Sequence, residues 1–379
     1  MINQTVELPY VEDVFEGFCN RLLEMGLPLE RATLHLRTLH PQFLGGRFLW
    51  LKETKKVDLA VIGREALTID AFRNSPVRAL YEGAEGIRQR LDVPPQEDEF
   101  GVYQDLRNEG LTDYVALPLI TVSGQRHASS WSTGQKGGFS TEHLSIISEL
   151  LPVLSMAAEI RLNRRIAKNL LNTYVGSYAG NRVLDGDIER GQGETIRAAI
   201  WICDLRDFTS LSERNTQAQV IQTLDDYFEV MGAAVVKHGG EILKFIGDAM
   251  LAIFPTDQIS NPACVAIDAA LEAVEAMDKL NERRHGDELE ALDYGIGLHV
   301  GDVIYGNIGT MDRLDFTVIG PAVNMTARLE HLCRSLGPKV LVSAAFAEAC
   351  SRPLTSMGFH GLRGISQAVE VFAPPSIIP

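Results

Sequence analysis

The order of element types between residues 196 and 300 constrains the fold more than any other feature of this chain. Apolar runs of strand length alternate there with segments whose apolar side chains repeat at the helical period. The strand-like runs are residues 196–204, 242–245, 250–254 and 293–300, and the helical segments are residues 216–237 and 263–283. This order, βαββαβ, is that of the ferredoxin-like split unit, a mixed α/β (α+β) fold.

Two aspartates in this region stand at the ends of strand-like runs. Asp204 closes the apolar run 198–203, and Asp248 follows Gly247 between the two strands of an expected hairpin. A carboxylate at a strand end is partly desolvated, which is costly unless a cation neutralises it. Taken alone, each aspartate can be interpreted as an ordinary turn residue that ends its strand. Brought together by adjacent strands, the two would suit hard divalent ions that hold nucleotide phosphates.

Composition and charge narrow the class of protein. With 379 residues, 45% of them apolar and 22% charged, the chain is typical of globular proteins and long enough for two domains. A formal net charge of −15 argues against nucleic acid or an anionic membrane as the main partner. We expect no membrane span and no signal peptide, because no apolar stretch reaches about 18 residues. The five cysteines include no C-x-x-C pair, so we expect reduced thiols and a cytoplasmic location.

Residues 1–155 are expected to form a separate α/β domain. An amphipathic helix opens it, and three strand-like segments follow at residues 31–37, 47–52 and 114–119. Ser140 is placed to cap a long helix in which Pro152 predicts a kink. The lone histidines His127 and His143 are interpreted as surface or structural groups.

The order of these segments resembles a GAF domain. The matching features are a strand with residues 116–119 (ALPL), a turn, a second strand, residues 137–140 (GGFS) and the closing helix. The resemblance implies a regulatory or sensor domain. A small-molecule ligand and a purely structural role in dimerisation both stay open.

Residues 156–191 are expected to be a helical linker between the two domains. Apolar side chains repeat through residues 156–175 with basic residues between them, which favours a two-stranded coiled coil over a helix on a membrane surface. Residues 180–194 are rich in glycine and charge and predict a loop before the second domain, residues 192–379.

Four motifs of the second domain occur in the order found in class III nucleotidyl cyclases, and the chain resembles their catalytic domain. The motifs are residues 202–209 (ICDLRDFT), 240–250 (GEILKFIGDAM), 297–303 with 306–309 (GLHVGDV and GNIG), and 317–330 (TVIGPAVNMTARLE). The resemblance implies a reaction in which the ribose 3′-oxygen attacks the α-phosphate of a nucleoside triphosphate. A 3′,5′-cyclic nucleotide and pyrophosphate are then the products.

The resemblance also implies which residues hold metal and which act on the phosphate. Asp204 and Asp248 would hold two Mg²⁺ or Mn²⁺ ions per active site, with Leu205 in the same metal set. The ions would lower the pKa of the attacking hydroxyl and neutralise the triphosphate. Asn324 and Arg328 lie four residues apart, on one face of a helix. Asn324 would orient the ribose, and Arg328 would meet the charge that develops on the α-phosphate.

Lys244 bears on the choice of base. Adenine N1 is an acceptor and an ammonium group only donates, so Lys244 favours ATP. Thr317 stands where the best-known adenylate members have Asp; its hydroxyl can accept from the adenine amino group. This departure resembles the subgroup often described as bicarbonate-responsive, and it keeps guanylate cyclase as a rival. The resemblance adds Arg363, as a triphosphate contact, and Phe208 and Thr209 to the substrate-binding residues.

The family arrangement also implies an oligomer. The two aspartates of one subunit complete a site with Lys244, Thr317 and the other substrate residues of a second subunit. A chain that carries both sets predicts a homodimer with two equivalent sites and an inactive monomer. The chain departs from the family pattern at two positions. Asp207 stands where the family often has Gly, and Pro321 stands where it often has Asp. Neither position is a metal or base contact, so we do not expect these departures to inactivate the site.

Other interpretations of the site fit the spacing less well. The chain has no G-x-x-x-x-G-K-[ST], and residues 295–300 begin like G-x-G-x-x-G but lack the last glycine. Residues 239–243 resemble a diguanylate cyclase signature, which leaves Asn324 and Arg328 unexplained. A catalytically silent scaffold protein is the remaining alternative, and the intact set of functional residues argues against it. We therefore expect an adenylate cyclase, a phosphorus–oxygen lyase with ATP as substrate, regulated by its N-terminal domain.

Overall fold

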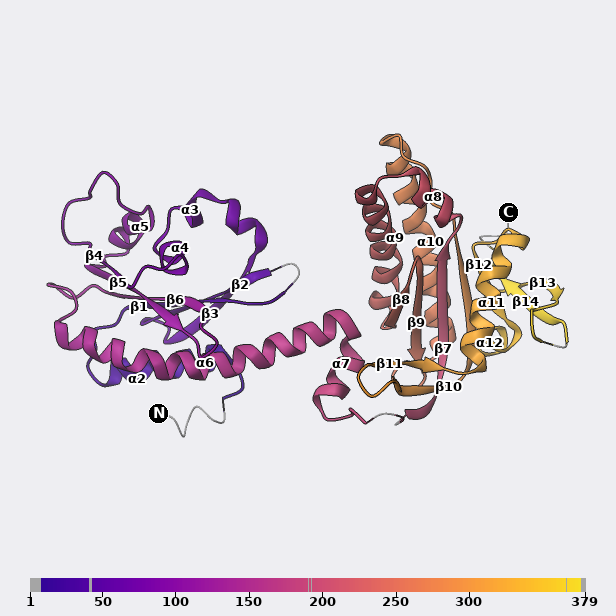
Figure 1. The fold of residues 1–379 in the computed structure, drawn as a ribbon, viewed down its shortest axis with the longest axis horizontal. Coiled ribbons are helices and arrows are strands. Elements are labelled where there is room, and N and C mark those ends of the chain that lie inside the picture. Colours follow the sequence, from indigo (N-terminus) through magenta and orange to yellow (C-terminus); the bar gives the residue numbers. More distant parts are fainter. Residues whose placement is uncertain (1–7, 41–42, 190, 192, 366, 376–379) are drawn as a thin grey trace. The chain divides into compact units, whose positions relative to one another are not determined.

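The computed structural model describes residues 8–40, 43–189, 191, 193–365 and 367–375 (Figure 1). The chain divides into two compact units, Met1–Leu170 and Leu171–Pro379.

An antiparallel sheet of six strands forms the centre of the first unit. In sheet order the strands are β3 (Lys56–Gly63), β2 (Phe43–Leu51), β1 (Arg31–Arg37), β6 (Arg126–Thr133), β5 (Asp113–Ile120) and β4 (Ile87–Arg90). The predicted strand at residues 31–37 is confirmed as β1, and the expected segments at residues 47–52 and 114–119 overlap β2 and β5. The unit is α/β, as expected, whereas its GAF resemblance stays a prediction.

The two faces of this sheet are covered by different helices (Figure 1). One face carries α2 (Val11–Glu24) and α6 (Thr141–Val175); the other carries η1 (Arg64–Thr68), α3 (Asp70–Arg73), α4 (Pro76–Tyr81) and α5 (Val102–Asn108). Alternation along β1 decides which side chain meets which face. Ala32, Leu34 and Leu36 are buried in the core with α2 and α6, so the polar residues between them point toward α3 and α4.

Helix α6 closes the first unit and continues into the second. Its start matches the prediction, because Ser140 Oγ accepts the backbone N–H of His143 at 3.2 Å. The helix is continuous through Pro152. Among the described residues it is the one helix long and apolar enough to cross a membrane by length and composition. Leu151, Leu154 and Leu162 are buried in the core of the first unit, and 28% of the apolar window is buried in all.

The second unit contains an eight-stranded sheet. Its order is β13 (Thr355–His360), β14 (Val369–Ala373), β12 (Val340–Ser343), β10 (Tyr294–Gly309), β7 (Gly193–Leu205), β9 (Ala249–Pro255) and β8 (Glu241–Ile246), with β11 (Leu314–Ile319) paired to β10. The antiparallel order β10-β7-β9-β8, with α9 (Gln217–Lys237) and α10 (Pro262–Gly286) as crossovers, is the predicted ferredoxin-like unit.

Alternation along β7 builds a separate core on each side of this sheet. Trp201 and Cys203 pack with α9 and α10, whereas Ala198 and Ile200 pack with β11 and with α7 (Ser177–Leu184). The loop expected over residues 180–194 is wrong in its first part, where the chain completes α7. Ala179 and Gly180 are buried there, and such small residues let a helix lie close to the sheet. The remaining helices are α8 (Phe208–Arg214), α11 (Pro321–Leu336) and α12 (Ala344–Ala349).

Candidate active site

Asp204 and Asp248 lie face to face in the second unit. Asp204 is the last residue but one of β7, and Asp248 follows Gly247 in the two-residue turn between β8 and β9. Gly247 has φ +66°, which the first central position of a type II′ hairpin turn requires. Because β7 pairs with β9, with Cys203 opposite Met250, the turn is held beside the end of β7. The Asp248 carboxyl is close enough to that of Asp204 to raise its pKa.

The surroundings of Asp204 fit a divalent cation. Burial and the neighbouring Asp248 carboxyl raise the pKa of Asp204 to about 7, although the backbone N–H of Leu205 donates to its carboxylate. Asp204 Oδ1 is buried and has no hydrogen-bond partner in the described part of the chain. A cation would supply both the missing partner and the missing positive charge. Oxygen ligands of this kind are those that Mg²⁺ and Mn²⁺ prefer.

The protein supplies few metal ligands. The described residues contain no group of three or more His, Cys, Asp or Glu that could hold a metal ion. Mg²⁺ in nucleotide sites is commonly held by one or two carboxylates together with water and substrate phosphates. The Asp204–Asp248 pair therefore suits ions that arrive with a nucleotide.

Glu330 on α11 is a third carboxylate near this pair, and sequence reasoning did not assign it a role. Burial raises the pKa of Glu330 to about 7; the nearby Arg206 opposes this, whereas Asp248 adds to it. Gly295 is opposite Asp204 in the sheet, and a Cβ there would lie 2.7 Å from Glu330 Oε1. A Cβ at Gly297 would lie 2.4 Å from the carbonyl oxygen of Thr326. These two glycines let α11 pack directly on β10, which only the tertiary structure reveals.

Lys244 and Thr317 lie on neighbouring segments of the second unit. Lys244 on β8 forms an ion pair with Asp315 on β11. Thr317 is two residues further along β11, on the same face as Asp315, because Phe316 between them is buried in the core. Asp315 was not predicted. The structure therefore places a carboxylate acceptor, Asp315, next to the Lys244 ammonium group. Asp315 lies two residues before Thr317, the position that the family resemblance indicated.

Asn324 and Arg328 lie on α11, as expected. Asn324 is exposed and Arg328 is half-buried. The Arg328 guanidinium lies against the segment between β13 and β14, since a Cβ at Gly364 would be 3.3 Å from Arg328 Nη2. Arg363, the preceding residue, is exposed. Arg328 and the Arg363 segment are thus neighbours although 35 residues separate them in the sequence.

The first motif ends in α8. Phe208 is partly buried against the core and Thr209 is exposed. Asp207 has φ +54°, in the left-handed region that glycine adopts freely and that Asn and Asp tolerate better than other residues. This conformation explains why a Gly position of the family can hold Asp. Pro321, the other departure, is the first residue of α11, where its fixed φ and missing N–H are favourable.

The predicted residues fall into two groups that are not bonded to each other in this chain. In the described part of the molecule, no hydrogen bond or ion pair joins the Asp204–Asp248 pair to the predicted substrate residues. The latter are Lys244, Thr317, Asn324, Arg328 and Arg363.

The comparisons with known proteins agree with the motifs. The family described as "Adenylate and Guanylate cyclase catalytic domain" matches residues 193–362. The second unit is a class III cyclase catalytic domain, and the chain belongs to that family. Its fold is also the one found in a bacterial light-regulated adenylyl cyclase, which covers 73% of this chain at a TM-score of 0.51 and 21% identity.

Two further relatives resemble the cyclase unit in sequence. An adenylate cyclase of Anabaena cylindrica is 37% identical over 189 residues, which are 49% of this chain. A crystallised guanylyl cyclase, Cya2, is 31% identical; the match covers 48% of this chain and 92% of that one, with a TM-score of 0.43. The chain spans 36% of the Anabaena relative and smaller shares, 11% and 27%, of the next two curated relatives.

Proposed function

We propose that this protein is an adenylate cyclase that converts ATP to 3′,5′-cyclic AMP and pyrophosphate. The observation that carries the proposal is the Asp204–Asp248 pair, whose facing carboxylates and unpartnered buried oxygen suit divalent cations. The family match to residues 193–362 and the adenylate cyclase relative support the same activity.

The proposed chemistry needs positioning and charge more than covalent participation by the protein. Asp204 and Asp248 would hold two Mg²⁺ or Mn²⁺ ions, which lower the pKa of the ribose 3′-hydroxyl and neutralise the triphosphate. Asn324 would orient the ribose, and Arg328 would stabilise charge on the α-phosphate. Arg363, beside the segment that Arg328 contacts, would bind the terminal phosphates.

Lys244 and its ion pair support ATP as the substrate. The ammonium group can donate to adenine N1, an atom that carries a hydrogen in guanine. Asp315 holds Lys244 in place, and Thr317 beside it can accept from the adenine amino group. Guanylate cyclase activity is the alternative to be tested.

A homodimer would bring the two groups of residues together. Exposed apolar side chains lie on the strands that carry Lys244 and Thr317: Ile246 on β8, and Ile304 on β10, which pairs with Ile319 on β11. An exposed apolar patch of this kind indicates an interface. We propose that a second copy covers it and adds its Asp204–Asp248 pair.

The contacts of α7 support regulation through the linker. The backbone N–H of Ala179 on α7 donates to Glu241 at 3.3 Å, and Tyr305 OH on β10 donates to the same carboxylate at 2.9 Å. Glu241 is on β8, three residues before Lys244. A displacement of α7 would therefore reach the strand that reads the base. We further propose a sensor role for the first unit, with a small-molecule ligand, and a cytoplasmic location.

The experiment is product formation by the purified protein with ATP or GTP, in Mg²⁺ or Mn²⁺. We expect cyclic AMP from ATP and little product from GTP. The variant Lys244→Glu should lose ATP turnover much more than GTP turnover. The charge swap Lys244→Glu with Asp315→Lys restores the ion pair but not the base contact, so it should stay defective with ATP. Cyclic GMP as the main product would contradict the proposal.

A further inference from the structure

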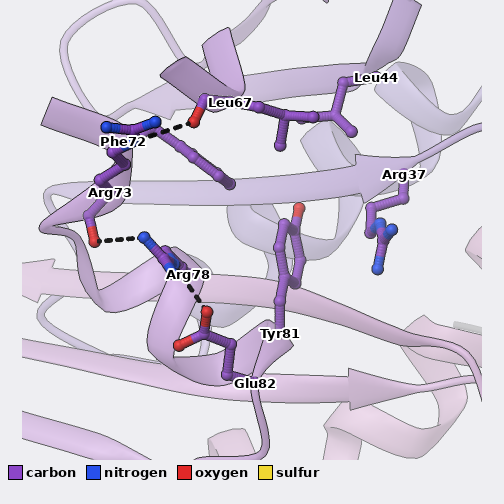
Figure 2. Close-up of a pocket in the computed structure, with 8 residues that line it drawn as sticks. All are labelled: Arg37, Leu44, Leu67, Phe72, Arg73, Arg78, Tyr81 and Glu82. Carbon is purple, nitrogen blue, oxygen red and sulfur yellow. Dashed lines mark hydrogen bonds and ion pairs between the residues drawn. The ribbon is translucent and has the colours of Figure 1, made fainter. Parts of the chain in front are cut away.

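A large cavity lies in the first unit between the sheet and its short helices. Its volume is about 760 Å³, within the range of sites for small organic molecules. Its lining includes β1 and β2 on one side and residues of α3, α4 and α5 on the other. A smaller adjoining pocket, of about 430 Å³, shares Arg37, Leu44, Phe72 and Tyr81 with it (Figure 2).

The alternation of β1 explains why this cavity is polar at its floor. Its odd-numbered residues, which include Arg31, His35 and Arg37, line the cavity, because the even-numbered ones are buried in the core on the other face. On β2, Arg47 is directly opposite His35 in the antiparallel register. Three arginines therefore line one cavity, in which the described lining contains a single carboxylate, that of Asp105.

These arginines are poorly neutralised by the protein. Arg47 Nε is buried and has no hydrogen-bond partner among the described residues. In the part of the chain that the structure describes, the Arg31 side chain has a single ion pair, a distant one with Glu109 at 3.6 Å. The guanidinium of Arg37 lies 5.4 Å from the centre of the Tyr81 ring, and both side chains line the pocket in Figure 2.

Nearby arginines that serve structural roles are bonded differently. Arg78 donates to Glu82 at 2.7 Å and to the carbonyl of Arg73, while Arg73 donates to the carbonyl of Leu67, as Figure 2 shows. Burial and the positive charges of Arg47 and Arg31 lower the pKa of His35 to about 4. The imidazole is therefore neutral at neutral pH, and the positive charge in the cavity is that of the guanidinium groups.

We propose that this cavity binds a small organic anion, whose carboxylate or phosphate group is held by Arg47, while Arg31 and Arg37, at the two ends of β1, add positive charge to the lining. Guanidinium groups bind both kinds of oxyanion through paired N–H donors. The rest of the cavity is lined by apolar and aromatic side chains, including Ile69, Phe72 and Tyr81. This lining fits an apolar, planar body attached to the acid. Binding here does not depend on the proposed cyclase activity.

Calorimetric titration of the full chain with three matched probes tests the proposal. The probes are 1-naphthyl phosphate, 1-naphthoate and the uncharged 1-naphthol, with EDTA present so that metal-bound phosphate at the cyclase site does not contribute. We expect at least one acid to bind about tenfold or more tightly than 1-naphthol. The preferred acid identifies the anionic group as phosphate or carboxylate.

Variants locate the binding. Arg47→Gln should weaken binding of the preferred acid by about tenfold to a hundredfold. Arg37→Gln, at an exposed position where folding is not at risk, should weaken it in the same direction. Arg21→Gln removes the same charge from exposed α2, on the other face of the sheet, and should leave binding unchanged. Equal binding of 1-naphthol, no binding of either acid, or wild-type affinity in both Arg47→Gln and Arg37→Gln would overturn the proposal.

Discussion

Two side chains in the candidate sites of this protein contain a buried polar atom that lacks a hydrogen-bond partner among the described residues. Asp204 has a buried oxygen without a partner, and Arg47 has a buried N–H without one. Buried polar groups are normally satisfied, so at these two residues, each in a candidate site, we expect a bound group to supply the missing partner. Lys244 shows the opposite case, because its ammonium group already has a partner, the Asp315 carboxylate.

The first prediction concerns metal binding by Asp204. In Asp204→Asn, cyclase activity should fall to background. Without metal the variant should be more stable than wild type, by roughly 1 kcal/mol, because repulsion with Asp248 and Glu330 is relieved. Mn²⁺ should raise the melting temperature of wild type but not of the variant. An equal Mn²⁺ shift in both proteins would refute the assignment of Asp204 as a metal ligand.

The second prediction concerns His127, which is buried on β6 and accepts the backbone N–H of Arg37 through Nδ1 at 3.1 Å. Burial, then the charge of Arg37, lowers the pKa of His127 to about 4, while Glu159 opposes this. The unfolded chain therefore binds a proton below about pH 6.5 that the folded unit excludes. Stability should be complete above pH 6.5 and fall as the pH drops toward 4.

The variant His127→Asn keeps an acceptor for Arg37 and removes the titrating group. As the pH falls from 6.5 to 4, the free energy of unfolding of the variant should decrease less steeply than that of the parent. The difference in slope should be up to about 1.4 kcal/mol per pH unit. Trp50 and Trp131 belong to the first unit, so urea denaturation in a Trp201→Phe background reports that unit by fluorescence. Identical pH dependence of variant and parent would show that His127 is not the group responsible.

At the scale of elements, α7 is the segment that connects the linker to the strands of the site. Tyr178 on α7 stacks on Tyr305 of β10, with ring centres 5.6 Å apart. The Arg182 guanidinium lies 5.6 Å from the ring centre of Phe316 on β11. Since Phe316 lies between Asp315 and Thr317, α7 contacts the face of β11 opposite to the one that carries these two residues.

The third prediction tests this contact. Tyr305→Phe removes the hydroxyl that donates to Glu241 and should destabilise the second unit by about 1–3 kcal/mol, because a buried carboxylate loses a partner. Tyr178→Phe keeps the ring stacking and should change stability by less than about 0.5 kcal/mol. Both values come from thermal denaturation. We also expect lower ATP turnover in Tyr305→Phe. Wild-type turnover in this variant would show that the contact between α7 and Glu241 does not influence the active site.

At the scale of the whole molecule, the proposed active site combines residues of two copies of the chain. This leads to the fourth prediction. Asp204→Asn and Arg328→Ala should each be inactive, yet mixing them should restore about a quarter of wild-type activity. Random association makes half of the dimers mixed, and each mixed dimer has one intact site of two.

A matched control uses two variants of the same group. Asp204→Asn mixed with Asp248→Asn should restore nothing, because every site then contains a defective aspartate pair. The mixtures are compared by cyclic AMP formation after joint refolding. Restoration by both mixtures, or by neither, would refute the shared-site arrangement.

The sequence by itself predicted the βαββαβ elements of the cyclase unit and the family of that unit. The apolar periods and Gly247 specify local structure, because side-chain alternation and turn geometry depend on near neighbours. The motif order then led to Asp204, Asp248, Asn324 and Arg328. The long helix from Ser140 followed for the same local reason, since a cap and an apolar stripe need no distant partner.

Only the tertiary structure decided which residues from distant segments meet. Asp315 reaches Lys244 across 71 positions of sequence, and Glu330 reaches Asp204 because Gly295 and Gly297 admit α11. The early residues of the expected loop became part of α7 because burial against the sheet outweighed their weak local preference. The arginine cavity likewise arises from the pairing of β1 with β2, since strand register decides which charges share a face.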